Sequence, residues 1–312
     1  MKLSRRAFLQ WSAAGAAGAS LFGVPVRADD ARGMPTRPLG RTGYQVSLFS
    51  LGGEGVIKQP GREAKADAII RRALDLGVNY IDTAPSYGNG VSERNIGRVM
   101  KERRKDVFLA SKTHDRTYDG TLRLIEQSLR RLQTDYLDLY QLHNLRVASD
   151  IERSFGRNGA LRALERLKDQ KVIHHIGLTG HRDPSILRQG IEAHAFDCIL
   201  LTLNAADKHN LPFQDDVLPH AVEQDLGIIA MKVPAHGRIL RPDGVPTMKK
   251  ALSYVWTFPV STAIVGISEM GQLEENIAIA RDFKPYSETM MAHVADLTAH
   301  YHEEASWFKY YW

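Results

Sequence analysis

Residues 136–143 read Tyr-Leu-Asp-Leu-Tyr-Gln-Leu-His, a largely apolar run of strand length that ends at an ionisable side chain. Two earlier runs have the same form, Val-Asn-Tyr-Ile-Asp at 78–82 and Val-Phe-Leu-Ala-Ser-Lys at 107–112. Strands of parallel sheets are buried on both faces, so they read as near-continuous apolar runs. Because neighbouring parallel strands end on the same side of a sheet, we expect the polar residues at these ends to share one space.

The alternation of strand-length runs with amphipathic segments continues along the chain. The strands that it predicts are residues 47–51, 78–82, 107–111, 136–142, 173–178, 198–201, 227–231 and 261–265. The helices that it predicts are residues 63–76, 92–103, 121–132, 160–170, 184–192, 216–224, 247–256 and 272–281. Within 121–132, for example, Leu122, Ile125, Leu129 and Leu132 recur at helical spacing.

Repeated strand–helix units of this kind predict an α/β fold, a closed (β/α)8 TIM barrel. An open doubly wound sheet is the alternative, but Gly52-Gly53-Glu54-Gly55 after the first strand does not fit the glycine-rich turn of that fold. Two glycines around a polar turn in Leu39–Ser47 predict an N-terminal β-hairpin. The predicted parts are a signal peptide (1–28), a linker (29–38), the barrel with its hairpin (39–284), and a C-terminal helix with an aromatic tail (285–312).

The N-terminal segment has the pattern of a targeting signal. Ser4-Arg5-Arg6-Ala7-Phe8-Leu9-Gln10 precedes an Ala/Gly-rich run, and Val26-Arg27-Ala28 has the small residues that a signal peptidase uses. This segment resembles a twin-arginine export signal, which implies recognition by the twin-arginine export machinery and a periplasmic location. The apolar run is short for a stable membrane span in the mature protein, and an uncleaved anchor is the alternative.

Composition excludes several other classes. Residues 1–28 hold four of the 41 basic residues, so the rest of the chain has 37 basic against 36 acidic residues and no basic stripe for nucleic acid. The single cysteine, Cys198, excludes an internal disulfide and a cysteine-ligated zinc ribbon or iron–sulfur cluster. We expect Cys198 to be a small buried residue, and we expect a monomer without metal.

The strand ends suggest proton-transfer chemistry. Asp82, Lys112 and His143 lie at these ends, and Tyr87 follows the first of them in a turn. A lysine cation lowers the pKa of a nearby phenol, a carboxylate holds that lysine, and a histidine orients a substrate oxygen. Together they suit proton transfer to a carbonyl oxygen, for which a nicotinamide or flavin must supply hydride. Taken singly, each residue also has a structural interpretation. Asp82 fits a helix or turn cap and Tyr87 a turn cover, while Lys112 fits a surface residue and His143 a hydrogen-bonded core residue.

Several motifs resemble the aldo-keto reductase superfamily over roughly residues 36–283. They are Ile81-Asp82-Thr83-Ala84-Pro85-Ser86-Tyr87-Gly88, Ser92-Glu93, Asn95-Ile96-Gly97, Ala110-Ser111-Lys112-Thr113, Asp135–His143, Ile176–Thr179, Ile229–Lys232 and Gln272–Asn276. The resemblance implies a TIM barrel that binds NADP or NAD and reduces a small carbonyl or sugar-like substrate to an alcohol. It implies that Tyr87 is the proton donor, that Lys112 and Asp82 tune it, and that His143 orients the carbonyl.

The positions that the resemblance assigns to the cofactor depart from the family pattern. Thr179 and Gly180 stand where a Ser-Asn pair usually holds the carboxamide, and Leu203, followed by Asn204, stands where a tyrosine usually stacks on the nicotinamide. Gly266 and Gln272 replace the Lys and Arg that often hold the 2′-phosphate of NADP, so the preference for NADPH rests on family frequency.

The resemblance assigns three further cofactor positions in the last loop and the helix that follows it, Ser268, Glu275 and Asn276. Alternatively, Gln272, Glu275 and Asn276 are ordinary residues of the first turn of the last helix.

The aromatic tail and the activity each have more than one interpretation. The aromatic tail, Trp307–Trp312, reaches the substrate pocket, packs on the outside or base of the barrel, or forms a patch for a partner. The alternative to carbonyl reduction is an exported protein with a retained nicotinamide cofactor that acts as a sensory or accessory subunit, or in redox-neutral sugar chemistry.

Overall fold

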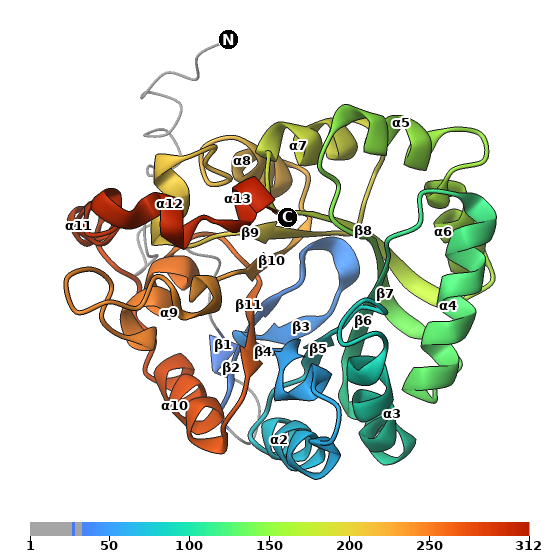
Figure 1. Ribbon diagram of the computed structural model, residues 1–312, viewed down its shortest axis with the longest axis horizontal. Coiled ribbons are helices and arrows are strands. Elements are labelled where there is room, and N and C mark those ends of the chain that lie inside the picture. The colour runs from blue at the N-terminus through green and yellow to red at the C-terminus, as the bar shows by residue number, and fades with distance from the viewer. Residues whose placement is uncertain (1–26, 29–32, 312) are drawn as a thin grey trace.

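The computed structural model of the protein describes residues 27–28 and 33–311. A closed barrel of parallel strands stands at its centre, in the order β10-β11-β4-β5-β6-β7-β8-β9, which confirms the predicted (β/α)8 fold (Figure 1). Its strands are β4 (Phe49–Gly55), β5 (Tyr80–Asp82), β6 (Phe108–Thr113), β7 (Leu137–Leu142), β8 (Ile173–Gly180), β9 (Cys198–Thr202), β10 (Gly227–Met231) and β11 (Thr262–Ile267). The predicted signal peptide lies outside the described residues, except for Arg27 and Ala28.

Helices cover the outside of this barrel. They are α2 (Glu63–Asp75), α3 (Val91–Arg103), α4 (Tyr118–Leu132), α5 (Ala148–Phe155), α6 (Ala160–Asp169), α7 (Pro184–Ala193), α8 (Val217–Glu223), α9 (Met248–Thr257) and α10 (Met270–Arg281). The apolar stripe predicted in α4 faces the core, because Ile125 and Leu132 are buried and Leu122 and Leu129 pack against the same cluster. The sequence did not predict α5, whose only large apolar side chains are Ile151 and Phe155.

The N-terminal hairpin starts earlier than predicted. Strand β2 (Pro35–Pro38) pairs antiparallel with β3 (Gln45–Ser47) and with β1 (Arg27–Ala28), so part of the predicted linker 29–38 is a strand. Between β2 and β3, the turn η1 (Gly40–Thr42) lies against the start of β10, where Arg41 N donates to Asp225 O at 3.0 Å. The hairpin therefore covers the N-terminal end of the barrel.

A buried arginine fixes this hairpin. Arg37 is 1 % exposed, and its guanidinium donates to the carbonyl oxygens of Trp256 at 2.8 Å and Val260 at 2.7 Å. These carbonyls belong to the end of α9 and the loop before β11. The predicted first strand is also longer than expected, since β4 continues to Gly55.

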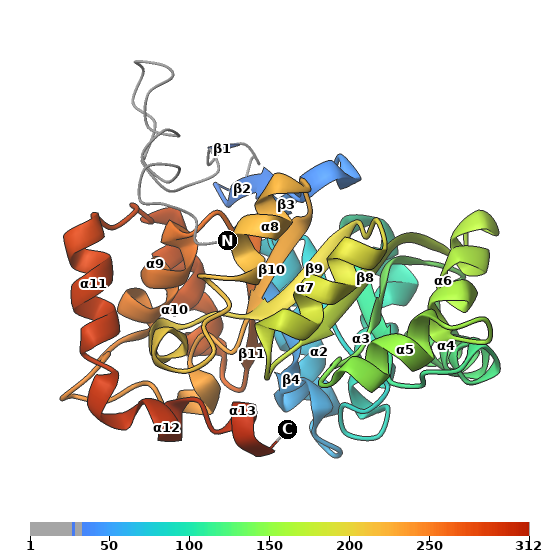
Figure 2. The ribbon, with the colours of Figure 1, turned by 90° about the horizontal axis from the view of Figure 1, so that it is seen from above.

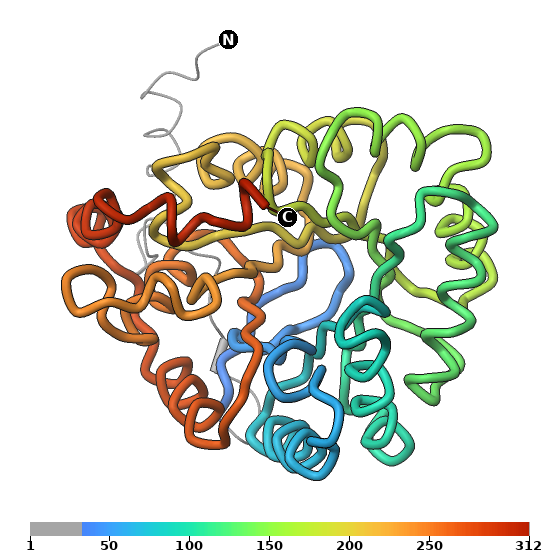
Figure 3. Tube along the Cα trace, viewed as in Figure 1, coloured from blue at the N-terminus to red at the C-terminus, as the bar shows by residue number. Residues whose placement is uncertain are grey.

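The C-terminal segment crosses the opposite end of the barrel. It consists of α11 (Glu288–Asp296), η6 (Ala299–Tyr301), α12 (His302–Ala305) and α13 (Phe308–Tyr311). Figure 2 shows the hairpin at one end of the barrel and α12 and α13 at the other. In Figure 3 this last segment runs from the rim towards the centre of the barrel. Because α12 contacts η4 (Ala205–His209), which follows β9, the tail lies on the end where the strands finish.

Among the helices of the described residues, we find none whose length and apolar character would allow it to cross a membrane.

Candidate active site

The structure brings the four predicted catalytic residues together at the C-terminal ends of three adjacent strands. Asp82 is the last residue of β5, Lys112 lies near the end of β6, and His143 directly follows β7. Tyr87 lies in the turn between β5 and α3. Strands β5, β6 and β7 pair in parallel, which sets this arrangement.

Lys112 and Asp82 form a buried ion pair. Each side chain is 1 % exposed, and Lys112 Nζ donates to Asp82 Oδ1. The ammonium also donates to Thr83 O at 2.8 Å, while Gln141 Nε2 donates to Asp82 Oδ2 at 3.3 Å. The desolvation of both charges is offset only if such additional hydrogen bonds fix the pair. Burial, the largest effect, raises the pKa of Asp82, and Lys112 acts in the opposite direction.

Tyr87 lies between this pair and His143. Lys112 Nζ is 5.0 Å from the centre of the Tyr87 ring, and the His143 ring meets the Tyr87 ring edge-on with centroids 6.2 Å apart. Burial, followed by the charges of Asp82 and Glu54, raises the pKa of the Tyr87 phenol well above its usual value. The sequence-based expectation of a lowered phenol pKa is therefore wrong, because burial and the two carboxylates raise the pKa of Tyr87.

The surroundings of His143 favour the neutral imidazole. Burial lowers the pKa of His143 well below its usual value, and the cations of Lys112, Arg116 and Lys232 lower it further. A neutral imidazole donates one hydrogen bond without carrying charge. It is therefore suited to hold a carbonyl oxygen near the Tyr87 hydroxyl.

A second ionisable cluster, which the sequence analysis did not single out, lies at the ends of β4 and β10. Glu54 Oε1 accepts from Lys58 Nζ at 2.9 Å, and Glu54 Oε2 lies 3.7 Å from Lys232 Nζ. His236 Nε2 is 2.9 Å from the same Lys232 nitrogen. Burial lowers the pKa of Lys232 to about 8. The rule that found the first four residues applies here too, since Lys232 directly follows the strand Gly227–Met231 and Glu54 lies near the end of β4.

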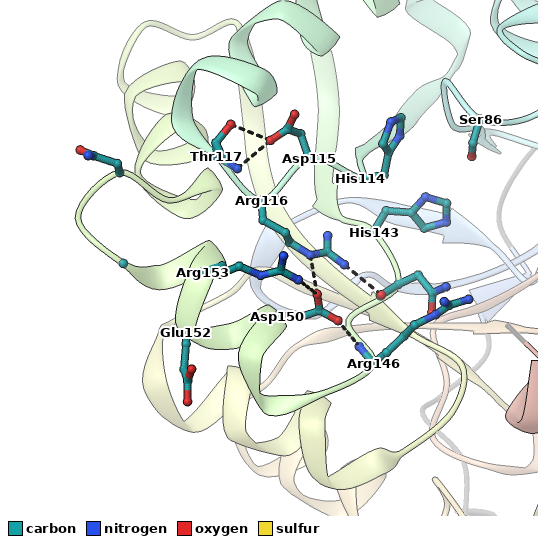
Figure 4. A pocket seen from close by; sticks show the side chains of 13 residues that line it. Ser86, His114, Asp115, Arg116, Thr117, His143, Arg146, Asp150, Glu152 and Arg153 are labelled. Atoms are coloured by element: carbon teal, nitrogen blue, oxygen red, sulfur yellow. Dashed lines mark hydrogen bonds and ion pairs between the residues drawn. The ribbon is translucent and has the colours of Figure 1, made fainter.

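A pocket of about 870 Å³ opens beside His143 (Figure 4). It is bounded by the segments after β5, β6 and β7 and by α5 and the turn that follows it. Its lining residues are Ser86, His114, Asp115, Arg116, Thr117, His143, Asn144, Arg146, Asp150, Glu152, Arg153, Gly156 and Asn158. Because His143 lies in its wall, this pocket is the candidate substrate site.

Two of the predicted cofactor residues, Thr179 and Gly180, contact the backbone of the segment that follows His143. Thr179 is fully buried, and its Oγ1 accepts from Asn144 N at 3.2 Å, so it fixes the segment that follows His143. At Gly180, a Cβ atom would lie 2.9 Å from Leu145 O. This close approach explains why the asparagine that is common in the family does not fit here.

Two others, Leu203 and Asn204, belong to the loop after β9. Leu203 is fully buried in the main apolar cluster, so its side chain does not line the open mouth. Asn204 Oδ1 accepts from Ala206 N at 3.0 Å and Asp207 N at 3.1 Å, and its Nδ2 donates to Lys232 O at 3.0 Å. Asn204 therefore joins this loop to the loop after β10 and caps η4.

The remaining five surround the start of α10. Gly266 is exposed in β11, and Glu275 is exposed on the helix. Gln272 Oε1 accepts from Ser268 N at 2.9 Å and Glu269 N at 3.1 Å, which completes a capping box at the helix start. Asn276 is 2 % exposed, and its Oδ1 has no hydrogen-bond partner among the described residues.

Comparison with known proteins identifies the family. The family model "Aldo/keto reductase family" matches residues 48–244. The chain belongs to the aldo/keto reductase family. Relatives include the oxidoreductase YqkF of Bacillus subtilis, 26 % identical with 79 % of this chain and 91 % of that protein covered. L-galactose dehydrogenase of Arabidopsis thaliana is 27 % identical, with 80 % and 88 % covered.

Solved structures agree with this assignment. The holo form of the aldo-keto reductase AKR11C1 of Bacillus halodurans has a TM-score of 0.72 and 26 % identity, with 85 % of this chain and 96 % of that chain covered. The relatives of this aldo/keto reductase support an NAD(P)-dependent oxidoreductase activity. Among the described residues, no group of three or more His, Cys, Asp or Glu side chains could hold a metal ion. Cys198 is fully buried, as expected, and burial raises the pKa of its thiol.

Proposed function

We propose that this aldo/keto reductase reduces an aldehyde or ketone to an alcohol with NADPH or NADH, and that Tyr87 donates the proton. The observation that carries the proposal is the packing of the Tyr87 phenol between the Lys112 ammonium and the His143 imidazole. A phenol with a pKa above its usual value is fully protonated at neutral pH, so the proton is present when the carbonyl arrives.

Each residue has a defined part in this reaction. The neutral His143 donates a hydrogen bond to the carbonyl oxygen and holds it towards the Tyr87 hydroxyl. Tyr87 transfers its proton as negative charge develops on that oxygen. Lys112 then stabilises the phenolate that remains, and Asp82 keeps the ammonium in place. The bound nicotinamide supplies the hydride.

Residues along β8 to β11 and around the second cluster fit a dinucleotide. Lys232 and Lys58 provide cations for its phosphates. Asn276 Oδ1, which accepts no hydrogen bond from the described residues, is an acceptor suited to an adenine amino group. Thr179 and Asn204 support this side of the site through the backbone. Binding titrations with NADPH and NADH decide between the two cofactors, because Gly266 and Gln272 provide no cation for the 2′-phosphate.

We further propose that the twin-arginine segment directs the folded protein to the periplasm. Fractionation of cells that produce the full chain, compared with a variant in which Arg5 and Arg6 are both replaced by Lys, tests this proposal. Retention of the variant in the cytoplasm supports it. Equal distribution of the two proteins contradicts it.

One observation favours the second candidate, a protein that retains its cofactor. Lys309, in the C-terminal tail, pairs with the buried Asp207 at 2.5 Å and donates to Leu211 O at 2.7 Å. This contact fixes the tail over the loop that follows β9, beside the proposed cofactor side. Mass spectrometry of protein denatured directly from the periplasm tests retention. A stoichiometric dinucleotide supports the second candidate, and its absence favours exchange.

The principal experiment compares the wild type with Tyr87→Phe. We expect the variant to bind NADP⁺ or NADH with unchanged affinity and to lose turnover of small aldehydes by a factor of about 10² or more. Full activity in Tyr87→Phe would exclude Tyr87 as the proton donor. A wild type that binds a dinucleotide but reduces no member of a broad carbonyl panel would favour the second candidate.

A further inference from the structure

The pocket beside His143 has an uneven distribution of charge. Figure 4 shows His114 and His143 towards one end of the pocket and Glu152 towards the other. Arg146 comes from the same segment as His143, three residues later, and its side chain is exposed. Among the described residues, the side chains of Arg146 and His114 make no hydrogen bond or ion pair with a neighbour.

The acidic residues near this end already have partners. Asp150 Oδ1 accepts from Arg116 Nε at 3.1 Å and from Arg153 Nη2 at 3.0 Å, and Asp150 Oδ2 accepts from Arg146 N at 2.9 Å. Asp115 Oδ1 accepts from Thr117 N at 2.7 Å and from the Thr117 hydroxyl at 2.6 Å. One carboxylate thus faces two guanidinium groups, and no carboxylate in the part of the chain that the structure describes pairs with the Arg146 guanidinium.

Arg116 adds a fixed positive charge. Its Nη2 donates to Asn144 O at 3.0 Å, which holds the segment after β7 against the segment after β6. Its Nη1 is buried and has no hydrogen-bond partner among the described residues. Arg116 is thereby held by Asp150 and Asn144, while its charge acts on the space next to His143.

The pKa values of two histidines at this mouth are lowered by the same positively charged side chains. After burial, the charges that lower the pKa of His143 include Lys112, Arg116 and Lys232. Those that lower the pKa of His181, which is 3 % exposed, include Lys232, Lys112 and Arg146. The phosphates of a dinucleotide on the β8–β11 side would neutralise Lys232, but they do not account for Arg146 and Arg116 on the β6–β7 side.

We propose that this pocket binds an anionic group of the substrate, and that Arg146 is the side chain that contacts it. The substrate class is then a small aldehyde or ketone that carries a carboxylate or a phosphate, with the carbonyl at His143 and the anion at Arg146. Guanidinium groups bind both anions in a bidentate manner. This inference rests on the proposed carbonyl reduction and specifies its substrate.

The test uses pairs of substrates that differ only in the anion. Reduction of 4-oxobutanoate is compared with butanal, and reduction of glyceraldehyde 3-phosphate with glyceraldehyde, in the wild type and in Arg146→Gln and Arg146→Lys. Arg162→Gln, which removes an exposed arginine of α6 outside the pocket, is the control. The carboxylate pair and the phosphate pair identify which anion the pocket prefers.

We expect the wild type to have a higher kcat/KM for at least one anionic substrate than for its neutral partner. Arg146→Gln should raise KM for that substrate by about tenfold to a hundredfold, which corresponds to the loss of a charge-assisted hydrogen bond. It should leave the neutral partner unchanged, Arg146→Lys should restore part of the loss, and Arg162→Gln should behave as the wild type. Equal values for both members of each pair, or equal losses in Arg146→Gln, would overturn the inference.

A binding measurement separates this inference from the proposed activity. If no carbonyl is reduced, glutarate and inorganic phosphate are titrated by calorimetry into protein saturated with NADP⁺. Binding of either anion to the wild type and to Arg162→Gln, with loss in Arg146→Gln, supports the anion subsite even though the proposed reaction fails. Absence of binding, or equal binding to all three proteins, overturns the subsite.

Discussion

The ammonium nitrogen of Lys112 lies 5.0 Å from the centre of the Tyr87 ring and is held by the fully buried Asp82 carboxylate. We infer that the pair has two roles, one in the proposed proton transfer from Tyr87 and one in the stability of the barrel. Substitutions at Lys112 and Asp82 separate these two roles.

We predict that Lys112→Met loses both activity and stability. It leaves the Asp82 carboxylate buried without its cation, and breaking such a pair costs about 3–5 kcal/mol. The double variant Lys112→Met/Asp82→Asn removes the uncompensated charge, so it should regain part of the stability but not the turnover. Urea unfolding and aldehyde reduction measure the two effects. Recovery of activity together with stability in the double variant would contradict a chemical part for Lys112.

The charge of Lys232 predicts a pH dependence of dinucleotide binding. Burial lowers the pKa of Lys232 to about 8, so its positive charge is present below pH 8 and is lost as the pH rises above it. We expect the Kd for NADP⁺ to rise between pH 7 and pH 9.5, by up to about tenfold per pH unit above pH 8. Fluorescence titration across this range measures it.

The matched variants are Lys232→Met and Lys249→Met. Lys232→Met should bind weakly at every pH and lose the dependence around pH 8. Lys249 is an exposed lysine of α9 that pairs with Asp282 at 2.9 Å, and its substitution should leave the curve unchanged. A Lys232→Met curve that still bends near pH 8 would assign the titration to another group.

The substitution Gly180→Asn tests whether close packing explains the glycine at a position where the family usually has asparagine. A Cβ atom at this position would lie 2.9 Å from Leu145 O and 3.0 Å from Leu187 Cδ2. We expect Gly180→Asn to lower the free energy of unfolding by about 1–3 kcal/mol, because the backbone must move. It should also weaken activity, since Leu145 lies two residues after His143.

Gly271 provides the control for this substitution. It lies in α10, and a Cβ atom there would meet nothing within 4 Å. Gly271→Ala should therefore keep or slightly raise the stability, because alanine restricts the unfolded chain. Thermal unfolding of both variants is the measurement. A Gly180→Asn variant as stable as the wild type would show that the site tolerates the larger residue.

The contact between Asp207 and Lys309 predicts a pH dependence of stability. Burial, the largest effect, raises the pKa of Asp207 to about 6, and Lys309 acts in the opposite direction. Because the folded pKa is raised, the folded state binds more protons than the unfolded state between about pH 4 and pH 6. This carboxyl group therefore contributes stability at low pH that is lost as the pH rises through 6.

The comparison is between the wild type and Asp207→Asn, which keeps the shape and removes the titration. We expect the stability of the wild type relative to the variant to fall by about 1 kcal/mol from pH 5 to pH 7. Urea unfolding at both pH values measures this difference. An unchanged difference over this interval, together with a loss of wild-type stability below about pH 4, would mean that Lys309 outweighs burial and lowers the pKa of Asp207.

The sequence by itself determined the barrel and the positions of Asp82, Lys112 and His143. Apolar runs of strand length that alternate with helices predict a parallel sheet, and the lack of a fitting glycine-rich turn after the first strand favours the barrel over the open sheet. Residues at the ends of parallel strands then lie at one end of the barrel. Glu54 and Lys232 also lie at strand ends, so the sequence could have predicted their position at the mouth of the barrel.

Only the tertiary structure decided what depends on distances between segments far apart in the chain. Burial among strands and loops raises the pKa of Tyr87. The backbone of Leu145 lies so close to residue 180 that a side chain there would collide with it, which favours glycine. Residues 35–38 of the predicted linker form a strand because residues 36–38 pair with residues 45–47. The buried contact of Lys309 with Asp207 fixes the tail over the barrel mouth. Burial and close contact are sums over many neighbours in space, and local sequence patterns carry no record of those neighbours.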